Sequence, residues 1–148
     1  MMLLLGCSVS AAAQPDPCTL FTKDDVAAVL GAPPKADGHQ IMPGTCTWGA
    51  TGITLTVGRT DVDSPKTAGQ MLDVARTNAA PGEQIKDEAG LGDRALSRVD
   101  RYGRSAELQV AAGNRFWRFV VEAADQKIAV DTTLAQLRKL AGKAVAGG

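Results

Sequence analysis

Arginine is the side chain with the clearest chemical potential in the second half of this chain. Between residues 94 and 118, six arginines fall on predicted neighbouring strands and their turns: Arg94, Arg98, Arg101, Arg104, Arg115 and Arg118. A guanidinium group binds carboxylates and phosphates through paired hydrogen bonds, so a stripe of them would bind an anion. The alternative is a solvated sheet face on which acidic side chains pair with the arginines, namely Asp93, Asp100, Glu107 and Glu122.

The segment 115–123 alternates between two sets of side chains. Because successive residues of a strand point to opposite faces, Phe116, Arg118 and Glu122 share one face. If helices leave that face uncovered, these three residues and Arg98 form a binding surface, since arginine and aromatic side chains are enriched in interface hot spots. The alternative is that the aromatic residues belong to the core. We expect the partner to be a protein or a small anionic ligand of the cell envelope.

Groups suited to catalysis or metal binding are few. His39 is the single histidine and has no serine or cysteine nucleophile near it in the sequence. Asp61 and Asp63 alternate as oxygen ligands of a hard cation do, but the rest of a calcium loop is missing and a helix follows them. We therefore expect no catalytic residue, no metal site and no cofactor. The alternative function is a small hydrolase or lyase that uses carboxylates and arginines alone.

Cysteine usage indicates an oxidising compartment. Beyond residue 13 only Cys18 and Cys46 remain, which predicts a disulfide between them. A catalytic or metal-binding thiol pair is the alternative, and neither a Cys-x-x-Cys spacing nor clustered histidine supports it.

The uncharged segment 1–13 reads as a signal peptide, with an apolar run too short to span a bilayer. Small residues at Ala11 and Ala13 predict cleavage before Gln14. Alternatively, Leu4-Leu5-Gly6-Cys7 is a lipobox whose Cys7 becomes lipidated. Both interpretations predict an exported protein of the periplasm or the extracellular space. Only the second attaches it to a membrane, through a lipid anchor.

Composition narrows the class of protein further. The chain has 148 residues, 16 basic and 16 acidic side chains and no net charge, which argues against binding to nucleic acid or to an anionic membrane surface. Its apolar fraction of 45% is too high for a disordered chain. At this length we expect residues 14–148 to form a single domain.

Hydrophobic periodicity supplies the elements that position these residues. We expect helices from residue 22 to 30, over 65–78 and over 127–144, with a tether at 14–20 and a loop at 35–44. Strands are expected from residue 45 to 57 as a hairpin, and over 94–99, 105–111 and 115–123, with a further strand as an option at 84–88. The last strand is apolar on both sides and is therefore expected to be central.

This element order is α-β-β-α-β-β-β-α. It predicts an α+β domain in which an antiparallel sheet carries amphipathic helices largely on one face.

Five short motifs carry a family resemblance: Cys18-Thr19-Leu20-Phe21-Thr22, Val26, Leu30-Gly31, Cys46-Thr47-Trp48 and Gly90-Leu91-Gly92-Asp93-Arg94-Ala95. In these motifs the chain resembles a domain-of-unknown-function family of small exported bacterial proteins, many of them actinobacterial lipoproteins. The resemblance implies an exported, disulfide-linked α+β module. It supplies no catalytic residue.

Overall fold

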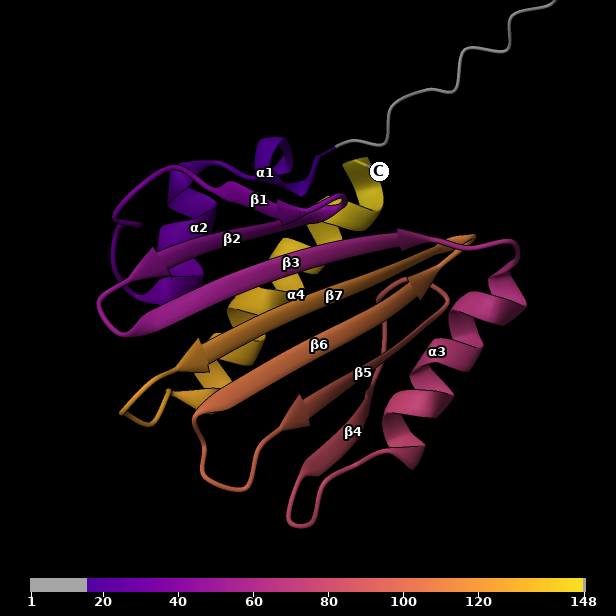
Figure 1. Cartoon of the computed structure of the whole chain (residues 1–148). Coiled ribbons are helices and arrows are strands. Elements are labelled where there is room, and N and C mark those ends of the chain that lie inside the picture. Colours follow the sequence, from indigo (N-terminus) through magenta and orange to yellow (C-terminus); the bar gives the residue numbers. More distant parts are fainter. Residues whose placement is uncertain (1–15, 148) are drawn as a thin grey trace, which may run out of the picture.

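The computed structural model describes residues 16–147 as one seven-stranded sheet with helices against it (Figure 1). The helices are α1 (Pro17–Leu20), α2 (Lys23–Leu30), α3 (Pro65–Thr77) and α4 (Val130–Gly147). The strands are β1 (His39–Met42), β2 (Thr45–Ala50), β3 (Ile53–Asp61), β4 (Gln84–Glu88), β5 (Arg94–Val99), β6 (Ser105–Ala112) and β7 (Arg115–Ala123).

Strand order across the sheet is β1-β2-β3-β7-β6-β5-β4, and every neighbouring pair is antiparallel. The predicted α+β class is confirmed. The central place predicted for the strand at 115–123 is also confirmed, because β7 is the fourth of the seven strands. Side chains on both of its faces are buried, which explains why its sequence is apolar on both sides.

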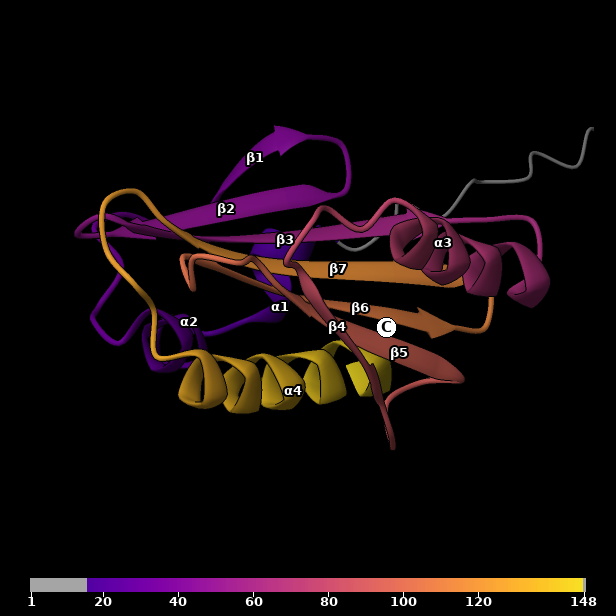
Figure 2. The ribbon, with the colours of Figure 1, turned by 90° about the horizontal axis from the view of Figure 1, so that it is seen from below.

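The two faces of the sheet are covered unequally. Helices α2 and α4 lie on one face, as predicted for most of the helices, and α3 lies on the other (Figure 2). Helix α3 packs over β5, β6 and β7, and it leaves β2 and most of β3 uncovered. The α3 face is therefore covered at one end of the sheet only.

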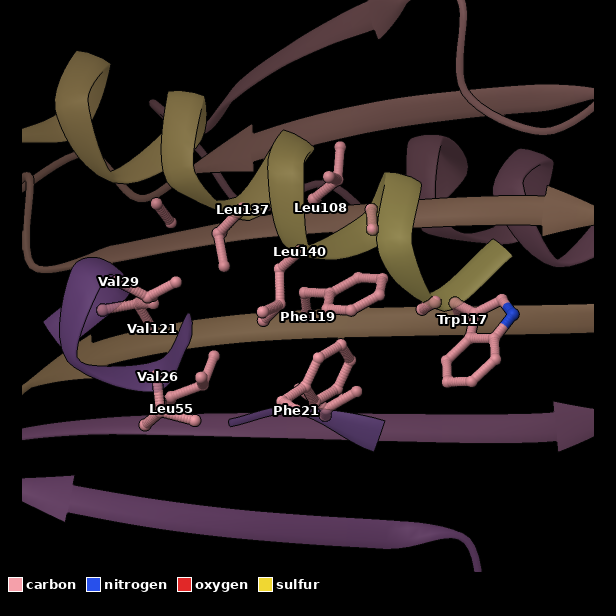
Figure 3. Packing of buried hydrophobic residues seen from close by; sticks show 14 of the residues in the cluster. Phe21, Val26, Val29, Leu55, Leu108, Trp117, Phe119, Val121, Leu137 and Leu140 are labelled. Atoms are coloured by element: carbon pink, nitrogen blue, oxygen red, sulfur yellow. The ribbon is translucent and has the colours of Figure 1, made fainter. Parts of the chain in front are cut away.

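The main core lies between the sheet and the pair α2 and α4. Leu137 and Leu140 of α4 pack towards Phe119 and Leu108 on the strands, and Val26 of α2 lies near Leu55 (Figure 3). A smaller cluster on the other face joins α3 to the sheet through Ala68, Leu72, Ala75, Leu96, Ala111 and Phe116. Two apolar clusters thus hold helices on opposite sides of one sheet.

Local signals set the ends of the helices. In α2 the Thr22 side chain accepts a hydrogen bond from the Asp25 backbone N–H, and the Asp25 side chain accepts one from the Thr22 backbone N–H. This is the capping box predicted from the sequence. Gly31 ends the helix in the left-handed conformation, with φ of 73°, which glycine adopts without steric cost. In α3, Ser64 caps the first turn and Pro65 occupies it.

Two short segments differ from their prediction. The loop expected at 35–44 contains β1, and the tether expected at 14–20 contains the single turn α1. All four residues of β1 are exposed, so no alternation of apolar and polar residues marks it in the sequence. A disulfide between Cys18 and Cys46, whose Cα atoms are 5.2 Å apart, joins α1 to β2 and agrees with the predicted pairing.

Within residues 16–147 no helix has the length and apolarity needed to cross a membrane. The predicted signal peptide and Cys7 lie outside the described residues.

Candidate functional site

The four predicted binding residues all lie on the α3 face of the sheet. Phe116, Arg118 and Glu122 alternate along β7, and Arg98 on β5 lies beside Glu107, its cross-strand neighbour on β6. Arg98, Phe116 and Arg118 line a common hollow. Glu122 lies farther along β7 and lines neither hollow of this face. The structure thus brings three of the four residues together.

A groove runs over the part of this face that α3 leaves uncovered. Its floor is formed by β2, β3 and β7, with α3 on one side and β1 on the other, and β1 rises from the sheet towards the side of α3 (Figure 2). The volume is about 380 Å³. Its lining residues are Ile41, Met42, Thr45, Thr56, Gly58, Thr60, Met71, Phe116, Arg118 and Val120. We call it the α3-side groove.

A second hollow of about 310 Å³ adjoins the α3-side groove. The two share Met71, Phe116 and Arg118, and the second continues along α3 to Val74 and across the sheet to Arg98. Phe116 itself is only 7% exposed, because α3 packs over it. The aromatic ring therefore contributes to the floor of the groove instead of projecting from it.

Arg118 is held at the junction of the two hollows by Glu107. Its Nε donates to one carboxylate oxygen at 2.6 Å and its Nη2 donates to the other at 3.2 Å. The hydrogen bond to Glu107 raises the pKa of Arg118. Glu107 is buried and also accepts a hydrogen bond from the Gln109 amide, whereas the Arg118 side chain is 55% exposed. Glu107 thus neutralises the guanidinium on the side of the sheet, and the rest of the guanidinium is open to solvent.

Arg98 is paired in the same way at the far end of the second hollow. Its Nε donates to Glu83 at 2.6 Å, and both side chains are largely buried. The hydrogen bond from Arg98 lowers the pKa of Glu83. Because Arg98 and Arg118 are both paired, the two adjoining hollows have little net charge, and their recognition chemistry is mainly apolar.

The arginine cluster of the sequence divides into two groups. Arg94, Arg98 and Arg118 form ion pairs with Asp73, Glu83 and Glu107, and of these carboxylates only Glu107 was an expected partner. Within residues 16–147, Arg101, Arg104 and Arg115 have no carboxylate within 4.0 Å.

Among the remaining expected acidic partners, Glu122 forms no ion pair within residues 16–147, and its charge adds to that of Glu107 in raising the pKa of Arg118. Asp93 and Asp100 have other roles. Asp93 accepts a hydrogen bond from the Gly113 backbone N–H at 2.7 Å, and Asp100 accepts backbone N–H groups of the β5–β6 turn. Both carboxylates therefore order turns.

Sequence reasoning missed the apolar rim of the α3-side groove and of the hollow that adjoins it. Ile41 and Met42 on β1 and Val74 on α3 are 54%, 59% and 57% exposed, which is unusual for large apolar side chains. The loop expected at 35–44 contains Ile41 and Met42, and their exposure follows from β1, which is exposed at every position.

Residues considered for catalysis or metal binding do not converge. His39 is exposed on β1, Asp61 pairs with the buried Arg59, and Asp63 accepts a hydrogen bond from the Thr67 hydroxyl. In the described part of the chain, no three metal-ligating side chains lie together.

No model of a known protein family matches this chain, and no curated protein matches it.

Proposed function

We propose that the protein is a non-catalytic binding module that holds an extended segment of a partner protein in the α3-side groove. The observation that carries the proposal is the apolar rim, where Ile41, Met42 and Val74 each expose more than half of their surface beside two adjoining hollows. Contiguous exposed apolar surface marks interaction sites, and binding sites are typically apolar with a few polar groups.

The lining of the groove indicates the chemistry of the segment. Methionine side chains adapt their shape to a partner, and Met42 and Met71 lie on opposite walls. The exposed side of Arg118 and the hydroxyl groups of Thr45 and Thr60 offer hydrogen bonds to backbone carbonyls of the segment. Because Glu107 already neutralises Arg118, the groove favours a segment with apolar side chains over a strongly anionic one.

The proposed place of action is the cell envelope. The disulfide between Cys18 and Cys46 supports an oxidising compartment. Together with the predicted signal peptide at 1–13 and the resemblance to exported bacterial proteins, it supports export. If Cys7 is lipidated, the lipid anchors the module to the membrane and the groove faces partners near its surface.

Gly58 provides a direct test, because its missing side chain leaves the floor of the groove open. A Cβ at this position would meet Thr45 Oγ1 at 3.5 Å, which is an ordinary contact, so a larger residue fits the strand and projects into the groove. Gly49 is the matched control. It lies on β2 on the same face, outside the groove lining, and a Cβ there meets nothing within 4 Å.

The experiment begins with selection of short peptides that bind the wild-type protein from a random displayed library. We expect Gly58→Leu to weaken binding of a selected apolar peptide by about tenfold or more, equivalent to about 1.4 kcal/mol, and Gly49→Leu to leave it unchanged. Circular dichroism and thermal unfolding verify that both variants fold. If the folded Gly58→Leu variant bound every selected peptide as tightly as the wild-type protein does, the proposal would be contradicted.

A further inference from the structure

A separate hollow lies among the connections at one end of the sheet. The α3–β4 loop, the β5–β6 turn and the β7–α4 connection meet at this end (Figure 1). Together they line a hollow of about 390 Å³, with Gly82, Asp100, Arg101, Tyr102 and Lys127 among its walls. We call it the turn hollow. It shares no lining residue with the α3-side groove or with the adjoining hollow.

Arg101 is held in position beside the turn hollow. A Cβ at Gly82 would meet the Arg101 Cβ at 2.9 Å, so the stem of the arginine packs directly on the glycine backbone. Its guanidinium lies over the Tyr102 ring, 4.5 Å from the ring centroid. The stem and the guanidinium of Arg101 therefore each have a packing contact, while the residue as a whole stays exposed.

Arg101 differs from most arginines of the described residues, because it packs against Gly82 and Tyr102 and has no carboxylate as an ion-pair partner. Six other arginines form ion pairs, whereas within residues 16–147 Arg101 has no acidic group within 4.0 Å. The neighbouring Asp100 uses its oxygens to accept the backbone N–H groups of Tyr102, Arg104 and Ser105. Lys127, which also lines the turn hollow, has no ion pair in the described chain. Two cations and one carboxylate, that of Asp100, thus line the turn hollow.

We propose that the turn hollow binds a phosphomonoester group. The two cations outnumber the single carboxylate of Asp100, so the turn hollow favours an anion. A phosphomonoester has a charge near −2 at neutral pH, and its oxygens accept paired hydrogen bonds from a guanidinium. Arg101 donates those hydrogen bonds and Lys127 supplies the second positive charge. The exposed face of the hollow beside Tyr102, which is 56% exposed, accommodates the carbon part of the ligand.

Titration of isotope-labelled protein tests this site by amide chemical shifts at constant ionic strength. The probes are inorganic phosphate and glycerol 3-phosphate, with sodium chloride as the reference. We expect saturable shifts at Gly82, Tyr102 and Lys127 with both probes. Tighter binding of glycerol 3-phosphate indicates an esterified ligand such as a lipid headgroup, and equal binding indicates free phosphate.

Charge-removing variants localise the effect. We expect Arg101→Gln to weaken binding of either probe by about tenfold, because it removes the charge-assisted hydrogen bonds. Arg115→Gln is the matched control, since Arg115 also lacks an ion pair but lies at the β6–β7 turn, at the other end of the sheet. Shifts that do not saturate, or an equal loss of affinity in the two variants, would overturn the proposal.

Discussion

At the scale of single residues, the groove depends on one carboxylate. Glu107 is buried on β6 and binds both the Arg118 guanidinium and the Gln109 amide. The carboxylate orients Arg118, so that a partner segment meets a fixed donor. The alternation of residues along the strands placed Arg98, Phe116 and Arg118 on one face. The sequence predicts Glu107 only as one of four candidate acidic partners. Its burial could not be predicted, because that burial depends on α3, which covers this part of the sheet.

Replacement of Glu107 tests this arrangement. We expect Glu107→Gln to lower the free energy of unfolding by about 1–2 kcal/mol, because it leaves Arg118 without its charge partner beside a buried amide. The expected loss is below that of a fully buried pair because Arg118 is half exposed. Urea unfolding measures the loss. Asp37→Asn, which breaks the exposed Lys23–Asp37 pair, serves as the control and should change nothing measurable.

At the scale of elements, the amphipathic segments were predictable, and the optional strand at 84–88 is the edge strand β4, whereas the opposite edge strand β1 was not predicted. Helix α3 and the strands β5, β6 and β7 have strong hydrophobic periodicity, and their observed bounds lie within a residue of those expected. Strand β1 is exposed at every position, so only backbone pairing with β2 defines it. The groove wall that β1 supplies therefore could not be predicted. The position of α3 on the second face also depends on the tertiary path of the chain.

Helix α4 is tied to the edge strand β4 by a charge pair whose effect depends on pH. Arg138 donates two hydrogen bonds to Glu88, at 2.9 and 2.8 Å, and these lower the pKa of Glu88 below its ordinary value of 4.5. A carboxyl group whose pKa is lowered on folding stabilises the protein above the unfolded pKa, and this stabilisation is lost as the pH falls through the folded pKa.

We therefore expect the wild-type free energy of unfolding to fall between about pH 5 and about pH 3. Glu88→Gln should be less stable at neutral pH and lose less stability over this acidic range. Denaturant unfolding at a series of pH values measures the difference. Arg138→Gln removes the basic partner of the same ion pair. It should likewise reduce the loss of unfolding free energy over this acidic range. A Glu88→Gln profile parallel to that of the wild type would disprove the assignment.

The disulfide fixes α1 against β2, next to the start of β1. It links residues that are 28 positions apart, for which the chain-entropy model gives a stabilisation of about 3.5 kcal/mol. We expect the Cys18→Ala/Cys46→Ala variant to lose stability of this order in urea unfolding. Thiol titration of the unfolded, unreduced wild type should find both cysteines oxidised. Two reactive thiols in that titration would show that the disulfide does not form.

At the scale of the whole molecule, an unequal covering of the sheet produces the binding surface. Helices α2 and α4 bury one face, and α3 buries only part of the other (Figure 2). The uncovered strands β2 and β3 present threonines and glycine to that side, and the exposed apolar residues stand at its margins. The main core between the sheet and the helices α2 and α4 stabilises the fold, and the partly covered opposite face leaves an apolar groove for a partner.

The location of a bound peptide tests the central proposal most directly. Intermolecular nuclear Overhauser effects should be measured between a selected apolar peptide and the methyl groups of the protein. We predict contacts to Met42 on β1 and Met71 on α3 together, because only a segment lying in the α3-side groove reaches both walls. A peptide that binds with contacts elsewhere on the surface and with none to these two methionines would contradict the proposed function.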